Sequence, residues 1–126
     1  MSIRRKRTPP QVPPPEDAVF DRAHLRHYTM ESLELEREII DLFVGQLPAT
    51  LTMIAQADSA ASWKLATHTL KGSAAAVGAR RINQIAIDLE EAGFNLDVNV
   101  KKKLVTALEK AVADFRAMTV RIYSSP

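Results

Sequence analysis

Apolar side chains recur every three or four residues along four stretches of this chain, with polar side chains between them. This spacing places one apolar stripe along an α-helix. Short connections favour antiparallel neighbours, so the pattern predicts an all-α fold: an antiparallel four-helix bundle with a short extra N-terminal helix. The four stripes are Leu35, Ile39, Leu42, Phe43, Leu47, Leu51 and Ile54; Trp63, Ala66, Leu70, Ala74 and Val77; Ile82, Ile85, Ala86, Leu89 and Ala92; and Leu104, Leu108, Ala111, Val112, Phe115, Met118 and Ile122.

The short extra helix is expected from Asp21 to Tyr28, with Asp21 as its cap and Phe20 and Leu25 as apolar anchors. His24 and His27 are three positions apart on it, a spacing that permits two metal ligands. No third candidate ligand is nearby in the sequence. We therefore interpret both histidines as ordinary surface residues and predict no metal site.

The first long stripe carries two features that affect its helix. Thr29 followed by Glu31 predicts the helix start. Pro48 lacks a backbone N–H, so we expect a kink or a break, giving one long helix or two. Ile40 and Val44 lie at the edge of the stripe and either pack inward or contribute to a partner surface. The acidic residues between the apolar positions predict a solvated face; they are Glu31, Glu34, Glu36, Glu38 and Asp41.

The remaining helix ends are also marked in the sequence. Asp58 or Ser59 can cap the second long helix, and Gly78 can supply the left-handed residue that ends it. We expect a loop from Gly93 to Asn99 before the last helix. The cluster from Lys101 to Lys103 is interpreted as solvated, because cations in a first helical turn are mildly unfavourable against the helix dipole.

Residues 1 to 16 differ in composition from the rest of the chain. They hold five of the seven prolines and a basic cluster from Arg4 to Arg7, with almost no apolar periodicity. We expect an unstructured arm there and the bundle in residues 17 to 126. The formal charge of +2 arises within the first 17 residues, and the rest of the chain carries equal numbers of basic and acidic side chains. The basic balance therefore says little about the partner of the bundle.

Composition excludes several functional classes. The chain has no cysteine, which excludes disulfides and thiolate metal sites and fits a reducing cytoplasm. No apolar run approaches the length of a membrane span, and prolines follow the basic cluster where a signal peptide needs an apolar segment. With 126 residues, the chain is too short for a kinase with its own ATP-binding module. We expect a cytoplasmic, monomeric protein that is free-standing and needs no cofactor.

The second long helix carries a candidate reactive residue. On a helical projection, His68 points nearly opposite the apolar stripe, so it is expected to face solvent. Within about 60° of its direction lie Lys64, Lys71, Gly72 and Ala75. Glycine inside a helix costs about 1 kcal/mol relative to alanine, and we expect a side chain at position 72 to crowd the imidazole. These residues predict a docking surface with one titratable nitrogen.

Glu90 is expected beside His68 because of the short connection at Gly78. At a rise of about 1.5 Å per residue, His68 lies roughly 15 Å before this hinge and Glu90 roughly 18 Å after it. Gln84 is too close to the hinge to reach the imidazole. A hydrogen bond from Nδ1–H to Glu90 would fix the tautomer that leaves Nε2 free as a nucleophile.

The run HTLKGSAAAVGA, which contains His68, Lys71, Gly72 and Gly78, resembles the motif of histidine phosphotransfer (HPt) domains, the helical phosphocarriers of two-component phosphorelays. The resemblance extends from about residue 20 to residue 122 and includes the Leu89-Glu90 pair. Two positions depart from the family pattern. They are Thr67, where alanine is more usual, and the basic pair Arg80-Arg81.

The resemblance implies a function and roles for these residues. His68 would take a phosphoryl group from an aspartate of one receiver domain and pass it to another, with Mg²⁺ supplied by the receiver. Lys71, assisted by Lys64, would stabilise the phosphoryl group. Gly72 and Ala75 would leave space for the receiver of a response regulator or hybrid histidine kinase. Because catalysis resides mostly in the partner, the chain is not expected to be an enzyme.

Two other hypotheses stay open at this point. The chain could be a helical adaptor that docks receiver domains and never carries phosphate. The basic arm could alternatively bind nucleic acid, which would require a steep salt dependence that disappears when residues 1 to 16 are removed. We interpret the arm as solvated and expect neither a nucleic-acid nor a membrane partner.

Overall fold

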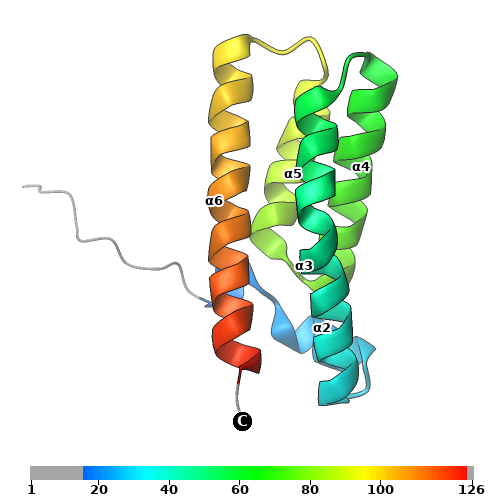
Figure 1. The fold of residues 1–126 in the computed structure, drawn as a ribbon, viewed down its shortest axis with the longest axis vertical. Coiled ribbons are helices and arrows are strands. Elements are labelled where there is room, and N and C mark those ends of the chain that lie inside the picture. Colours follow the sequence, from blue (N-terminus) through cyan, green and yellow to red (C-terminus); the bar gives the residue numbers. More distant parts are fainter. Residues whose placement is uncertain (1–15, 125–126) are drawn as a thin grey trace, which may run out of the picture.

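The computed structural model describes residues 16 to 124, so the expected arm, apart from Glu16, lies outside the described residues. The described part is helical and contains no strand. Figure 1 shows the four long helices side by side with alternating directions, and α2 at one end of them. The helices are α1 (Glu16–Val19), α2 (Arg22–Tyr28), α3 (Leu33–Gln56), α4 (Ala60–Val77), α5 (Arg80–Ala92) and α6 (Val98–Tyr123). The all-α bundle is confirmed, but two short helices precede it where the sequence predicted one.

The core lies between the four long helices and is closed at one end by the N-terminal segment. Phe115 on α6 is fully buried and contacts Phe20 and Phe43 edge to face, with ring centroids 5.4 Å apart in both pairs. Leu25 on α2 is also fully buried, so both predicted anchors of the short helix are confirmed. Asp21 caps α2 through a hydrogen bond from the backbone N–H of His24 to Oδ1. The short N-terminal helices are therefore part of the same core.

The start of α3 was predicted wrongly. Ser32 is its N-cap, and its hydroxyl accepts from the backbone N–H of Leu35. Thr29 instead belongs to a turn in which Met30 and Glu31 have positive φ angles of 53° and 64°. Two consecutive left-handed residues cannot begin a right-handed helix, so α3 begins only after them.

The expected break at Pro48 does not occur, because α3 continues through it as one helix. Pro48 is exposed, so the backbone hydrogen bond that proline cannot donate is missing on the solvent side of α3. The buried residues lie on the opposite side of the helix. Three of the expected apolar positions are exposed: Leu35, Leu42 and, at the end of α5, Ala92. The buried line on α3 consists of Glu36, Ile40, Phe43, Leu47 and Ile54.

Glu36 corrects the interpretation of the acidic residues as a solvated face. Its side chain is 1% exposed, and Oε1 accepts from Arg22 Nε at 3.1 Å and from Tyr123 Oη at 2.8 Å. Arg26 Nε lies 3.7 Å from the other carboxylate oxygen. A buried charge must be paired and hydrogen-bonded to be tolerated, and here the partners come from α2 and α6. This carboxylate joins α2, α3 and α6 at one end of the bundle.

The α3 helix also corrects the view that no segment could span a membrane. Its length and a mean hydropathy of 1.3 over an 18-residue window satisfy the criteria for a span. Core helices of soluble proteins satisfy the same criteria, and Phe43, Leu47 and Ile54 of α3 are buried against the other helices of the bundle. The hydropathy of α3 therefore does not indicate a membrane span.

The ends of α4 are fixed as the sequence predicted. Ser59 and Ser62 form a capping box at its start. Gly78 ends α4 with φ 82°, and a Cβ atom there would lie only 2.6 Å from the carbonyl oxygen of Asp21. That close approach accompanies a hydrogen bond from Asp21 N to Gly78 O at 2.8 Å. Gly78 is therefore required both for the helix end and for the crossing of the N-terminal segment.

The last loop is shorter than expected, because Asp97 caps α6 at Val98. Lys101 is half-buried, and its Nζ lies 5.3 Å from the centre of the Trp63 ring. The interpretation of the whole lysine cluster as solvated is therefore wrong for Lys101. Lys102 and Lys103 are exposed.

Candidate functional site

The two sides of α4 differ as the helical projection predicted. Every residue of its apolar stripe is buried, whereas the His68 side chain is 65% exposed. The indole Nε1 of Trp63 donates to the carbonyl oxygen of Leu89 on α5 at 3.1 Å. Thr67 is also buried, and its hydroxyl donates to the carbonyl oxygen of Trp63 at 2.9 Å. The Trp63 contact and the buried stripe fix the rotation of α4 against α5 and so place His68 on the outer surface.

Glu90 lies level with His68, as the helix geometry predicted. Its Oε2 is 3.1 Å from Nδ1 of His68, and its Oε1 is 2.6 Å from Nζ of Lys71. Gln84 lies elsewhere and donates to Asp88 Oδ1 on its own helix. The structure therefore brings His68, Lys71 and Glu90 together across the contact between α4 and α5.

The charge on Glu90 determines how the imidazole is oriented. The hydrogen bond from Lys71, with a smaller contribution from His68, holds the pKa of the Glu90 carboxyl below its ordinary value of 4.5, although burial opposes this shift. Glu90 is thus ionised at neutral pH and can only accept. The proton of a neutral imidazole then lies on Nδ1. Within residues 16 to 124, Nε2 has no hydrogen-bond partner, and this leaves its lone pair available.

The surroundings of His68 are small and open. Gly72, Ala75 and Lys64 are all exposed. A Cβ atom at Gly72 would meet nothing within 4 Å, so the expectation that a side chain there crowds the imidazole is wrong at the level of Cβ. Any steric reason for glycine at this position must therefore come from longer side chains or from a second molecule.

Two further residues lie near His68: Asn83, whose contact was not predicted from the sequence, and Leu65, which the helical projection places on the histidine side of α4. Asn83 on α5 donates through Nδ2 to the carbonyl oxygen of Lys71 at 2.9 Å. The same helix-rise estimate that located Glu90 could have located Asn83, five residues beyond the Gly78 hinge. Leu65, one turn before His68, is 60% exposed and adds apolar area to this surface.

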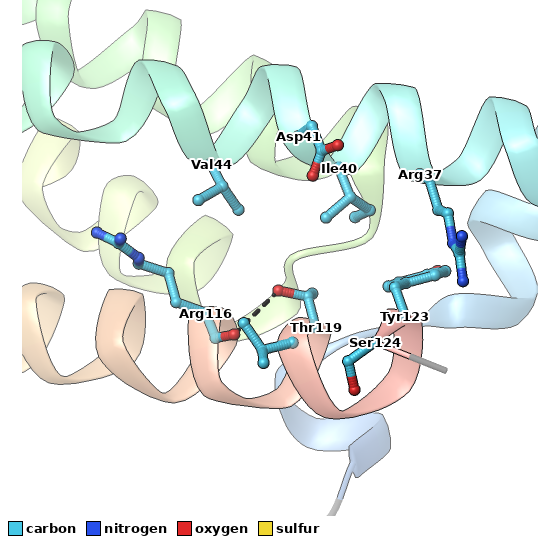
Figure 2. Close-up of a pocket in the computed structure, with 9 residues that line it drawn as sticks. Arg37, Ile40, Asp41, Val44, Arg116, Thr119, Tyr123 and Ser124 are labelled. Carbon is cyan, nitrogen blue, oxygen red and sulfur yellow. Dashed lines mark hydrogen bonds between the residues drawn. The ribbon is translucent and has the colours of Figure 1, made fainter. Parts of the chain in front are cut away.

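A separate hollow of about 320 Å³ lies between α3 and α6. Figure 2 shows that Arg116 and Arg37 lie at its two ends, with Ile40 and Val44 pointing between them. It contains no histidine, and its walls come from α3 and α6, whereas the His68 site lies on α4 and α5. This hollow is therefore not part of the site around His68.

Within residues 16 to 124, no group of three or more histidine, aspartate or glutamate side chains could hold a metal ion. His24 and His27 are both exposed on α2. His24 instead stacks on Tyr28, with ring centroids 6.5 Å apart.

Comparison with known proteins adds the family. The family model described as the Hpt domain matches residues 38 to 118, which include α4, α5 and most of α3 and α6. No curated protein and no solved structure gave a significant match. The matched segment covers more than half of the chain and contains His68, Lys71 and Glu90. The chain therefore belongs to the Hpt domain family, whose helical bundles act as histidine phosphotransfer carriers in phosphorelays.

Proposed function

We propose that Nε2 of His68 accepts a phosphoryl group from an aspartate of one receiver domain and passes it to an aspartate of another. The observation that carries this proposal is the contact between Glu90 Oε2 and His68 Nδ1 at 3.1 Å, on a ring that is 65% exposed. It supports a fixed tautomer with a nucleophilic nitrogen facing outward. A receiver domain can reach this nitrogen without any rearrangement of the bundle.

The bonds and charges of the phosphoryl transfer balance without a cofactor bound to this chain. The lone pair of Nε2 attacks phosphorus, the bond between phosphorus and the aspartyl oxygen breaks, and the aspartate leaves as a carboxylate. The imidazole then carries phosphate on Nε2 and the original proton on Nδ1, and its positive charge faces the Glu90 carboxylate. Reversal of these steps onto a second aspartate regenerates neutral His68. The Mg²⁺ that stabilises the aspartyl phosphate oxygens belongs, in this proposal, to the receiver.

Lys71 is the cation placed to stabilise the transferred group. Its Nζ is held at 2.6 Å from Glu90 Oε1, and Lys71 follows His68 by three residues, on the same side of α4. Phosphoryl oxygens on Nε2 would compete with Glu90 for this ammonium group, because both are anionic oxygen acceptors. Lys64 is exposed on the same side, so it supplies a second cation at longer range.

The surface around His68 also supports receiver docking. Gly72 and Ala75 leave it low, and Leu65 adds an exposed apolar side chain. Small apolar surfaces of this kind are typical of transient protein partners.

An adaptor that docks receivers without carrying phosphate remains the alternative. Incubation with a radiolabelled phospho-receiver separates the two functions. We expect label on the wild-type chain and none on His68→Gln, with the same circular dichroism spectrum for both proteins. If all label stays on the receiver and the two proteins behave alike, the adaptor is favoured and the carrier proposal fails.

A further inference from the structure

The contact line between α4 and α5 continues past His68 into a shallow depression of about 190 Å³. One hydrogen bond and the position of one residue connect this depression to the His68 site. Asn83, which lines it, donates to the carbonyl oxygen of Lys71, and Ala75 lies on the His68 side of α4, two turns or about 10 Å further along. A protein that covers His68 would therefore also cover the depression. Its lining comes from α4, α5 and the segment of α2: Asp21, His24, Ala74, Ala75, Gly78, Arg80 and Asn83.

One cation, Arg80, and one anion, Asp21, line this depression. Arg80 is exposed, and within residues 16 to 124 no carboxylate oxygen lies within 4.0 Å of its guanidinium group. Asp21 is the one acidic residue of the lining; its Oδ1 accepts from the backbone N–H of His24 at 3.1 Å, and its carboxylate forms no ion pair with Arg80. The exposed imidazole of His24 adds a second polar group that can donate a hydrogen bond.

The position of His24 is fixed by the packing of α2. The His24 ring lies parallel to that of Tyr28, with an interplanar angle of 16°. The helix itself is held by buried Leu25 and by the contact of Arg22 with Glu36. The backbone of this wall is therefore held in place by buried contacts, and the exposed His24 ring projects from it.

We propose that this depression takes an aspartate or glutamate side chain of the docking receiver, which is held between the guanidinium group of Arg80 and the imidazole of His24. The inference rests on the proposed function, because it concerns the protein that docks on His68. The guanidinium group of Arg80, which has no ion-pair partner in the described part of the chain, favours a carboxylate as the occupant, and the distance from His68 places it at the edge of the docked surface. Arg80 and His24 thereby act as specificity determinants: receivers with an acidic residue at the matching place dock better than others.

The chain supplies a matched control for each of these residues. Arg81 is exposed and follows Arg80 in the first turn of α5, yet it does not line the depression. His27 is exposed on the same helix as His24 and also lies outside the lining. Acidic residues are favourable in a first helical turn, so Arg80→Glu and Arg81→Glu should both fold.

The test uses a purified receiver domain that accepts label from the phosphorylated chain. We expect Arg80→Glu to raise the Kd for this receiver about tenfold and Arg81→Glu to change it less than about twofold. His24→Ala should weaken binding and His27→Ala should not. Replacing the contacted acidic residue of the receiver by arginine should restore binding to Arg80→Glu. Equal effects in the members of each pair, or no effect in any variant, would overturn the proposed contact.

Phosphoramidate, a small phosphodonor that does not need to dock, separates this inference from the proposed function. Its P–N bond breaks as Nε2 of His68 takes the phosphoryl group, and ammonia leaves. Labelling by phosphoramidate should be unchanged in all four variants. If neither phosphoramidate nor a phospho-receiver labels His68 in the wild-type chain, the proposed function fails. If labelling is normal but the paired variants bind the receiver alike, only the contact at the depression is wrong.

Discussion

Glu90 on α5 lies level with His68 on α4, and its Oε2 is 3.1 Å from Nδ1 of the imidazole. The other oxygen of the same carboxylate is 2.6 Å from Nζ of Lys71. One acidic side chain therefore orients the proposed acceptor and also holds the cation one turn away. Loss of Glu90 should disturb both functions together, whereas loss of Lys71 should leave the orientation of the ring intact.

Replacement of Glu90 tests the orienting contact. Glu90→Ala removes the acceptor that orients the ring and fixes its tautomer, so it should slow transfer from a phospho-receiver roughly 10- to 100-fold. Glu90→Gln should fall between this variant and the wild type, because its amide oxygen still accepts from Nδ1–H but cannot pair ionically with Lys71. Rapid-quench measurement of the labelled chain gives these rates. The neighbouring exposed Glu91→Gln is the control, and equal rates for all variants would remove Glu90 from the site.

Titration of Glu90 tests the ion pair directly. The Lys71 hydrogen bond lowers its pKa, so its contribution to stability is complete above the ordinary value of 4.5 and is lost as the pH falls through the lowered value. Carbon NMR of the Glu90 carboxyl should show titration below 4.5. The Lys71→Ala variant should raise this pKa toward the ordinary value. A pKa that is the same with and without Lys71 would contradict the contact.

Substitution of Gly72 separates folding from docking. A Cβ atom there meets nothing within 4 Å, so Gly72→Ala should raise the free energy of unfolding by up to about 1 kcal/mol, since alanine is the better helix former. Gly72→Gln should fold as well but should weaken receiver binding, as measured by titration calorimetry. Ala113→Gln, at an exposed position on α6, provides the control. Unchanged affinity of Gly72→Gln would mean that the receiver approaches from another side.

Glu36 should matter for stability and not for transfer. Its carboxylate is 1% exposed and is bonded by Arg22 and Tyr123, so Glu36→Gln leaves these groups without their anionic acceptor. We expect a loss of about 1–3 kcal/mol in the free energy of unfolding, measured by urea denaturation. The exposed Glu34→Gln should change it by less than about 0.5 kcal/mol. Similar values for both variants would show that the buried contact contributes nothing.

Tyr123 offers a second probe of the same contact. Burial, followed by the hydrogen bond to Glu36, raises its pKa to about 12 from the ordinary value of 10.0. The neutral phenol is therefore favoured in the folded state, and the stability that it contributes is present below pH 10 and is lost as the pH rises toward 12. Ultraviolet difference titration of the Tyr28→Phe variant, which keeps Tyr123 as the one remaining tyrosine of the sequence, should show ionisation near pH 12. Ionisation of Tyr123 at the ordinary value would contradict the buried contact.

The sequence predicted the site well because helix geometry determines it. The period of α4 fixes which side chains face outward, and the short turn at Gly78 fixes which residue of α5 lies level with His68. Neither inference needs the details of packing. The same geometry predicts the contact of Asn83 with Lys71, because both residues lie at similar distances from the turn at Gly78.

The sequence predicted the N-terminal half of the bundle less well, because residue type there was a poor guide to burial and to backbone conformation. Glu36 lies on the buried line of α3 by spacing, but its charge suggested solvent. Its burial depends on partners from α2 and α6 that are distant in the sequence, and such pairing cannot be derived from local periodicity. The left-handed turn at Met30 and Glu31 likewise has no glycine to mark it.

The attachment site of the phosphoryl group tests the central claim most directly. The chain would be labelled with heavy nitrogen in its histidines, phosphorylated by a receiver domain and measured by phosphorus–nitrogen correlation NMR. The geometry of His68 and Glu90 predicts phosphorus bonded to Nε2 of His68, with the proton retained on Nδ1. Phosphorus on Nδ1 of His68, on His24 or His27, or on no histidine at all would contradict the account.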